Sequence, residues 1–450
     1  MTTASHAWGS APSKRFDAIA ERFRGIFSEI GDDSIRHDLE RELRFDDYEV
    51  LKKVGFSRLR LPEKFGGLGL TLPELFGLII ELAQADPNLT NAYRSHLGFT
   101  EDLLNAAPSP WRDAWLERIG RGETIGSGFS EIGDAKLGTY STQLTRDGGG
   151  WRLNGEKYYT TGSLYADWIT LGAVDGDGVP VGALVPTKAE GVEILNDWDG
   201  FGQALTASGT ARFTDVAISE DLIKPSALRF SYSGGFFQLV HLASLAGIGR
   251  AAALEIARHV AERKRVYQRS NAARFSEDPQ VLQVVGRIRG AAYSAGAIVL
   301  KAAEALQAAY DANLSGDEER IASANRDAEL EVSQSVTVVS NLILDASTVL
   351  FDALGASAAK RSHGLDRHWR NARTITSHNP RIYHDRIVGD FAVNGAPPAP
   401  NGGVGIAPQT EKEKSEAGSK HVTRRVILIG ACLSVSAQCK QDSEIGQDLP

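Results

Sequence analysis

Sulfur is nearly absent from this 450-residue sequence. Met1 is the single methionine, and the two cysteines, Cys432 and Cys439, both lie in the final segment. The preceding part of the chain can therefore form neither a disulfide nor a thiolate metal site. Two explanations stay open: compositional drift, and selection for low sulfur content, as expected of a protein made during sulfur starvation.

An excess of positive charge is also lacking. The sequence has 49 basic and 57 acidic residues and a net charge of -8, which argues against nucleic acid or an anionic membrane as the main partner. Residues 426–437 form the longest apolar run near the C-terminus, too short to span a bilayer. Residues 1–24 lack the apolar core of a signal peptide. We expect a cytoplasmic protein that works without nucleic acid or membrane.

The familiar short motifs of catalysis are missing as well. The sequence contains no His-Glu-x-x-His, no paired-cysteine motif, no phosphate-binding Walker loop and no Gly-x-Ser-x-Gly elbow. Its ten histidines are scattered. We therefore expect no metal, and an organic cofactor remains the main candidate for the chemistry.

The hydrophobic period changes twice along the chain. Residues 14–118 have helical spacing, and residues 122–221 alternate with a period of two. In the second region Asn154-Gly155 predicts a hairpin turn between strands 151–153 and 156–161, and Asp147-Gly148 predicts another turn. Further strands are expected at 168–174, 181–185 and 211–216.

Residues 231–395 return to helical spacing. Long helices are expected at 236–265, 280–313 and 319–354, and Ala243, Gly247 and Ala251 form a small-residue face where another helix can pack closely. This order predicts an α+β fold whose second helical part is a bundle. The Pro/Gly-rich and then charged residues 396–450 predict a disordered tail.

Three segments in register resemble the acyl-CoA dehydrogenase superfamily. They are residues 62–69 (PEKFGGLG), residues 153–157 (LNGEK) followed by Thr161-Gly162, and residues 370–373 (RNAR). The resemblance covers roughly residues 15–395. It implies an N-terminal helical domain (1–120), a middle β-barrel-like domain (121–225) and a C-terminal four-helix bundle (226–395), assembled as a homotetramer. A flavin would lie between the β domain and the bundle.

Two departures from the family's pattern bear on function. The dehydrogenases need a carboxylate base, yet the two positions where members carry it are occupied here by Asn379 and Phe237. Where members have a glycine-rich segment against the FAD diphosphate, residues 352–358 read DALGASA. An acidic residue and alanines would repel and crowd a diphosphate. We therefore expect FMN, with FAD less favoured.

A more specific resemblance is to the dibenzothiophene monooxygenase branch. It rests on residues 365–374 (LDRHWRNART) with His378-Asn379-Pro380, and on residues 197–202 (DWDGFG) with 208–210 (SGT). It implies that a separate flavin reductase supplies FMNH2, and that a flavin C4a-hydroperoxide formed with O2 transfers oxygen to a soft centre. One departure is Ile375, where the branch often has a second histidine. Substrate contacts carried over from the branch are affected by this difference.

The resemblance also implies site residues, each with a simpler structural alternative such as a core histidine, a strand hydroxyl or a solvated helix face. Such a site needs a dry pocket and also a few hydrogen-bond partners near the flavin's central ring. The implied catalytic residues are His378, His96, Thr161 and Ser163. The implied cofactor contacts are Phe129, Ser130, Thr161, Lys264, Arg265, Arg370 and Asn379, with Lys264 or Arg265 placed to meet a phosphate. The implied substrate pocket comprises Trp198, Phe201 and Phe237.

These observations leave three hypotheses. The first is a monooxygenase that inserts one oxygen atom from O2 into a small organic substrate, with an organosulfur compound preferred and an amine or an indole-like ring as alternatives. The second is an FAD-dependent acyl-CoA dehydrogenase with a relocated base. The third is a non-catalytic flavin-binding protein.

Overall fold

The computed structural model describes residues 8–133, 139–225 and 228–398, and the expected tail lies outside this range from residue 399 onward. Helices come first, as the hydrophobic period predicts: α1 (Phe16–Asp32), α2 (Ser34–Glu40), α3 (Phe45–Lys53), α4 (Leu72–Ala85), α5 (Pro87–Asn105) and α6 (Pro110–Gly120). Helices α4 and α5 both begin at residues that cap a helix N-terminus. Thr71 and Glu74 form a capping box on α4, and the Asp86 carboxylate accepts a hydrogen bond from the Asn88 N–H at the start of α5.

The middle region is a sheet of eight strands: β1 (Ile125–Gly128), β2 (Gln143–Asp147), β3 (Gly150–Lys157), β4 (Trp168–Val174), β5 (Pro180–Pro186), β6 (Val192–Ile194), β7 (Ala211–Ile218) and β8 (Ile223–Lys224). The strand order is β6-β7-β3-β2-β4-β5-β8, and β1 pairs with β4. Alternate side chains of these strands, such as Leu144, Leu171 and Phe213, form one apolar core with residues of α5 and α6.

The hairpin prediction at Asn154-Gly155 is wrong. Both residues lie inside β3, which pairs continuously with β2 and, through a bulge between Leu153 and Gly155, with β7. Gly155 has φ +145°, and a Cβ there would lie 2.8 Å from the Thr142 Cα. The glycine therefore serves a β-bulge and a close strand contact instead of a turn. The neighbouring prediction is confirmed, because the β2–β3 turn follows Asp147 at Gly148.

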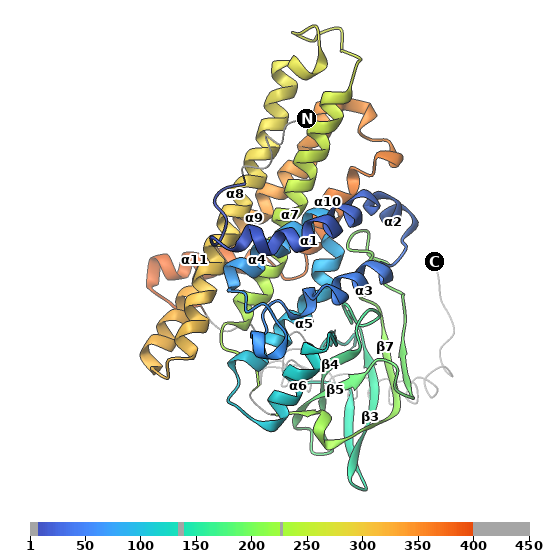
Figure 1. Ribbon diagram of the computed structural model, residues 1–450, viewed down its shortest axis with the longest axis vertical. Helices are drawn as coiled ribbons and strands as arrows, with labels where there is room; N and C mark the ends of the chain where they lie inside the picture. Colours follow the sequence, from blue (N-terminus) through green and yellow to red (C-terminus); the bar gives the residue numbers. More distant parts are fainter. Residues whose placement is uncertain (1–7, 134–138, 226–227, 399–450) are drawn as a thin grey trace, which may run out of the picture. The chain divides into compact units, whose positions relative to one another are not determined.

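The second helical region contains α7 (Ser233–Glu262), α8 (Pro279–Asn313), α9 (Glu318–Leu354), α10 (Asp366–Thr376) and α11 (Ile382–Asn394). The three long helices lie side by side (Figure 1) and begin and end within a few residues of their predicted bounds. The small-residue face of α7 packs on α4, since a Cβ at Gly247 would lie 2.4 Å from that of Ala83. The chain is therefore α+β, with helices before and after the sheet.

Two of these helices are apolar over a long stretch. By length and composition alone, parts of α7 and of Glu318–Ser357 could cross a membrane. The apolar window of α7 is 89% buried within the protein, and that of the second helix 44%. A buried core helix has the same composition as a membrane span, so these windows are weak evidence for one.

Candidate active site

One face of α5 brings together the groups of the candidate site. Residues three, four or seven positions apart lie on the same side of a helix, and Asn91, Arg94, Gly98 and Asp102 follow this spacing along about 16 Å. Asn91 donates a hydrogen bond to the side chain of Gln203. Arg94 and Gly98 meet the start of α7, and Asp102 meets the end of the sheet.

Phe237 of α7 lies directly against this face. A Cβ at Gly98 would be 2.2 Å from the Phe237 ring, so only glycine leaves room for the ring in this position. The Arg94 Nε–H donates to the Phe237 carbonyl at 3.1 Å, and the guanidinium lies 4.8 Å from the ring centroid. This cation–π contact and the hydrogen bond fix the guanidinium on the ring.

Two histidines meet beside Arg94. The ring of His378, in the turn after α10, lies 4.4 Å from that of His241 on α7, with a T-shaped geometry. His241 is 2% exposed and its Nδ1 has no hydrogen-bond partner, while His378 is open to solvent on one side. A buried imidazole nitrogen without a partner is costly. It marks this place as one where a ligand's polar atom would be accommodated.

The cluster is cationic and has no balancing carboxylate among the described residues. Desolvation on the side of the His378 ring that packs against His241, together with the Arg94 charge, lowers the pKa of His378, and burial and the Arg94 charge lower the pKa of His241 well below its usual value. Burial and the Arg229 charge lower the pKa of Arg94 to about 10. At pH 7 both imidazoles are therefore neutral and Arg94 is a cation.

The two positions expected to lack a base lie next to this cluster. Asn379 follows His378, with its Oδ1 at 3.3 Å from the His378 Nδ1, and its amide donates to the Gln238 Oε1 at 3.0 Å. Gln238 is the neighbour of Phe237. Neither an amide nor a phenyl ring can accept a substrate proton at neutral pH. The structure thus brings Asn379 and Phe237, the two positions at which family members carry the base, to the same cluster.

The carboxylates on the next turn of α5 are already engaged. Glu101 pairs with Arg60 and accepts a hydrogen bond from the Tyr232 hydroxyl at 2.7 Å. Asp102 lies 3.4 Å from Arg229 and 4.0 Å from Lys224 and accepts from the Phe230 N–H. Burial raises the pKa of Asp102, and the two cations oppose that rise.

The predicted flavin contacts of the sheet lie near the two ends of the α5 face. The Thr161 hydroxyl is 2.8 Å from that of Ser208, which connects through Thr206 to Gln203, the partner of Asn91. At the other end the Phe129 ring lies 5.7 Å from the Lys224 Nζ and 5.9 Å from the Arg229 guanidinium.

Ser163 and Ser130 have structural bonds of their own. The Ser163 hydroxyl is buried and donates to the Ser127 carbonyl at 3.1 Å, which holds the segment after β3 against β1. Ser130 is exposed, and its carbonyl accepts from the Tyr158 N–H at 2.9 Å. For Ser130 the observed contact is therefore made by the backbone, and its hydroxyl faces solvent.

His96 does not join His378. It is two positions from Arg94, hence on the opposite side of α5, and is fully buried in the N-terminal core. Its Nε2–H donates to the Ser57 carbonyl, and its ring packs against Tyr93. Burial lowers the pKa of His96 to about 4. His96 thus faces the N-terminal core with its Nδ1 unpartnered, and its implied catalytic role stays a prediction.

The structure does not bring Arg370, Trp198 and Phe201 to the histidine cluster, although the Trp198 Nε1–H donates to the Gln203 carbonyl at 3.1 Å, at the Asn91 end of the α5 face. Arg370 is held by Asp38 and Asp366 and donates to the Phe201 carbonyl at 3.0 Å. Phe201 is 55% exposed and stacks on Trp369, while Trp198 packs on Tyr159. Of the predicted substrate pocket, the structure brings only Phe237 to the histidine cluster. Arg370 is already paired with two carboxylates, and its implied cofactor contact stays a prediction.

Lys264 and Arg265 cannot reach this site within one chain. They follow the C-terminal end of α7, which ends at Glu262. The helix rises about 38 Å between Phe237 and that end, which exceeds the length of an FMN molecule. Both side chains are exposed. The structure therefore does not bring Lys264 and Arg265 to His378 of the same chain, and the phosphate contact stays a prediction.

Sequence reasoning missed Arg94 and His241. A signal for the first was the helical spacing of Asn91, Arg94 and Asp102, which places three polar side chains on one helix face. The second stands four residues after Phe237 inside a long apolar run, which places both on one helix face.

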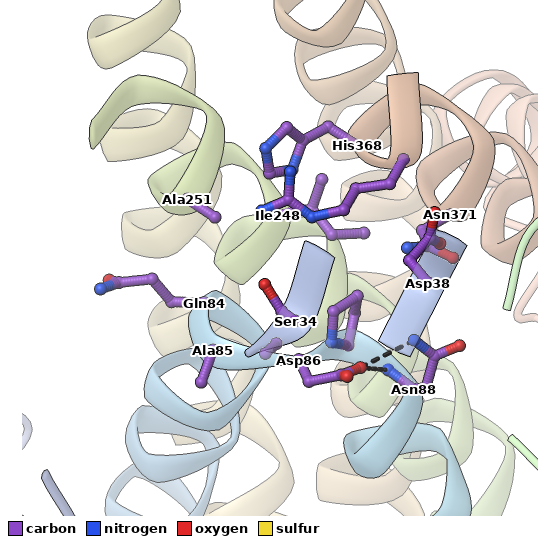
Figure 2. Close-up of a pocket in the computed structure, with 13 residues that line it drawn as sticks. Ser34, Asp38, Gln84, Ala85, Asp86, Asn88, Ile248, Ala251, His368 and Asn371 are labelled. Atoms are coloured by element: carbon purple, nitrogen blue, oxygen red, sulfur yellow. Dashed lines mark hydrogen bonds between the residues drawn. The ribbon is translucent and has the colours of Figure 1, made fainter. Parts of the chain in front are cut away.

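A small cavity elsewhere does not change this assignment. It has a volume of about 20 Å³ and lies between α2, α4, α7 and α10, with Ser34, Asp86, Ile248 and His368 among its lining residues (Figure 2). This volume suits about one water molecule. Among the described residues no group of three His, Cys, Asp or Glu side chains could hold a metal ion.

The residues of the α5 face fit a flavin ring. Phe129 and Phe237 offer apolar surfaces for its faces, and the Thr161 and Ser208 hydroxyls are donors of the kind that flavin carbonyl oxygens accept. The Nδ1 of His241 has no hydrogen-bond partner and is a further polar atom to which a ligand can bond.

Comparison with known proteins agrees with this architecture. Three consecutive family models match the chain: the acyl-CoA dehydrogenase N-terminal domain at residues 17–123, the middle domain at 131–216 and the C-terminal domain at 239–380. The chain belongs to the acyl-CoA dehydrogenase family.

Three relatives are monooxygenases. A dibenzothiophene monooxygenase of Mycolicibacterium goodii is 29% identical over 79% of this chain and 88% of its own length. The "Probable FMNH2-dependent monooxygenase SfnC" of Pseudomonas putida is 28% identical over 87% and 98%. The solved structure of the methanesulfinate monooxygenase MsuC of Pseudomonas fluorescens has a TM-score of 0.76 at 26% identity and covers 85% of this chain and 98% of its own.

Proposed function

We propose that the protein is an FMNH2-dependent monooxygenase that oxygenates a small organosulfur compound. One observation carries this proposal. Asn379 and Phe237, which occupy the two positions where family dehydrogenases carry their base, both lie beside two neutral histidines. The monooxygenase relatives support it, and one of them is named for reduced FMN. FMN is the cofactor, and FAD is disfavoured by the sequence of residues 352–358.

The chain's own residues position the reactants and exclude water. When bound, reduced FMN supplies the two electrons that activate O2. Phe237 and Phe129 would shield a bound flavin ring, and Thr161 and Ser208 would donate hydrogen bonds to it. The neutral imidazoles of His378 and His241 would hydrogen-bond to oxygen atoms without delivering a proton prematurely. One oxygen atom enters the substrate, the other leaves as water, and FMNH2 becomes FMN.

The proposal extends to partners and setting. A separate flavin reductase supplies FMNH2, as expected for a two-component enzyme. We also propose a cytoplasmic homotetramer, on the strength of the family resemblance. The low sulfur content suggests synthesis under sulfur limitation, and transcript levels indifferent to sulfate supply would remove this link.

The function is tested with purified protein and chemically reduced FMN. Methanesulfinate, dimethyl sulfide, dibenzothiophene, indole and a primary amine are offered with O2, and oxygen uptake above the flavin-only rate is measured together with product. Product formation from a sulfur compound is expected. Bleaching of bound oxidised flavin by an acyl-CoA would instead indicate a dehydrogenase, and the absence of uptake above background with every compound would indicate a non-catalytic flavin-binding protein.

A further inference from the structure

Arg94 and Arg250 differ from the other largely buried arginines among the described residues, because neither forms an ion pair with a carboxylate; Arg250 lies on the Trp8 ring and is affected by Glu81. Arg44, Arg60, Arg367 and Arg370 are each held by at least one carboxylate. Arg94 instead donates to a backbone carbonyl and lies on the Phe237 ring. The charged side chain that affects it is Arg229, another cation.

The groups that face Arg94 add no negative charge. His241 and His378 are neutral bases, and Asn379 is an amide. Asp102, on the same face of α5, is shared between Arg229 and Lys224. Keeping a partly desolvated guanidinium without a counter-ion costs free energy. The cost is offset when an anion binds, and the Arg94 Nη groups have the planar fork geometry that oxyanions match.

We infer that Arg94 binds the anionic oxyacid group of the substrate, and that this group is a sulfinate. The inference rests on the proposed function and names its substrate class. Two sulfinate oxygens accept from the guanidinium, and the imidazoles of His241 and His378 supply further hydrogen bonds. The methyl-sized substituent lies toward the Phe237 ring, which leaves the sulfur lone pair open to the oxygen donor.

The reaction balances with the co-reactants already proposed. The sulfinate sulfur forms one new S–O bond and is oxidised by two electrons to a sulfonate. O2 is reduced by four electrons, two from sulfur and two from FMNH2. Its second oxygen atom takes up two protons, which FMNH2 releases on becoming FMN, and leaves as water.

The first test uses the unaltered protein loaded with oxidised FMN. Calorimetric titration compares methanesulfinate with dimethyl sulfoxide, a neutral molecule of similar size that also has an S–O bond. We expect methanesulfinate to bind at least a hundredfold more tightly. Equal dissociation constants, or tighter binding of the neutral compound, would overturn the inference without need of any variant.

The second test uses Arg94→Met and Arg94→Lys, with Arg287→Met as the matched control because Arg287 is exposed on α8 and paired with Asp345. Arg94→Met should raise the dissociation constant and the KM for methanesulfinate about a hundredfold, as expected for a lost charge pair. Arg94→Lys should raise both constants by a smaller factor, and Arg287→Met should give the constants of the unaltered protein. Thermal unfolding verifies that each variant is folded.

The outcomes separate this inference from the proposed function. If Arg94→Met raises the dissociation constant of FMN and leaves that of methanesulfinate unchanged, the guanidinium serves the flavin and the inference fails. If neutral sulfides are oxygenated and Arg94→Met does not alter their KM, the substrate class is wrong while the monooxygenase stands. If no sulfur compound raises oxygen uptake, the proposed function itself fails.

Discussion

At the scale of single residues, the protein's chemistry depends on which groups are neutral. His378 and His241 sit against each other beside Arg94, and their lowered pKa values keep both uncharged at pH 7. Asn379 stands where a dehydrogenase would place its base. A site of this kind can orient and hydrogen-bond oxygen atoms, and it lacks the carboxylate with which the family's dehydrogenases remove a proton from carbon.

The first prediction concerns coupling between oxygen use and product. His378→Ala removes one of the two neutral hydrogen-bonding groups, so reduced flavin should react with O2 unproductively. We expect at least a tenfold loss of product per O2 consumed and a matching rise in H2O2, measured by peroxide assay. His259→Ala, which removes a histidine that stacks on His363, is the control. Unchanged turnover in His378→Ala would remove that residue from the site.

The second prediction separates His96 from His378. His96 is neutral and buried with a pKa of about 4, whereas an unfolded chain takes up a proton near 6.5. Its contribution to stability is therefore full above pH 6.5 and falls as the pH drops toward 4. Between pH 8 and pH 5 this amounts to about 2 kcal/mol of unfolding free energy.

In His96→Gln this part of the pH dependence should vanish while product per O2 stays unchanged. Urea unfolding at several pH values measures the pH dependence of stability, and the peroxide assay measures product per O2. A coupling defect like that expected of His378→Ala would show that His96 acts in catalysis after all.

At the scale of elements, α5 is the organising helix. It contacts both β1 and α7, and its polar face joins the segment after β3 to the histidine cluster. The closeness of α5 and α7 depends on Gly98, which gives Phe237 its place.

The third prediction follows from that contact. In Gly98→Ala the new Cβ would overlap the Phe237 ring, which must turn away and shift its contact with Arg94. The ring is the end of a side chain, so the fold should persist and kcat/KM should fall about tenfold or more. Phe237→Leu in the same chain should restore part of the loss. Gly290→Ala on α8, where nothing lies within 4 Å, is the control. Full activity of Gly98→Ala would contradict this arrangement.

The sequence predicted the positions of the helices and strands better than it predicted which side of each faces the site. Hydrophobic periods located the long helices and β4, and glycine-containing motifs identified the family. Asn154-Gly155 misled because the same dipeptide suits a hairpin turn and a bulge, and only the pairing of β3 with two neighbours decides between them. His96 and Arg94 are two positions apart, and which of them faces the site depends on how α5 packs.

At the scale of the whole molecule, the positions of Lys264 and Arg265 bear on how many chains assemble. They lie at the far end of α7 from their own chain's site. The fourth prediction is that sedimentation velocity gives a mass of about 194 kDa, that of four chains of 48.5 kDa. A concentration-independent mass of one chain would contradict the proposed homotetramer.

The claim on which the whole account rests is that this flavin site uses O2 in place of a thioester substrate. The direct test is a single-turnover reaction of the FMNH2-loaded protein with methanesulfinate under 18O2, with the sulfonate product analysed by mass spectrometry. We predict one 18O atom per product molecule. A product without label, together with anaerobic bleaching of the oxidised flavin by an acyl-CoA, would contradict the account.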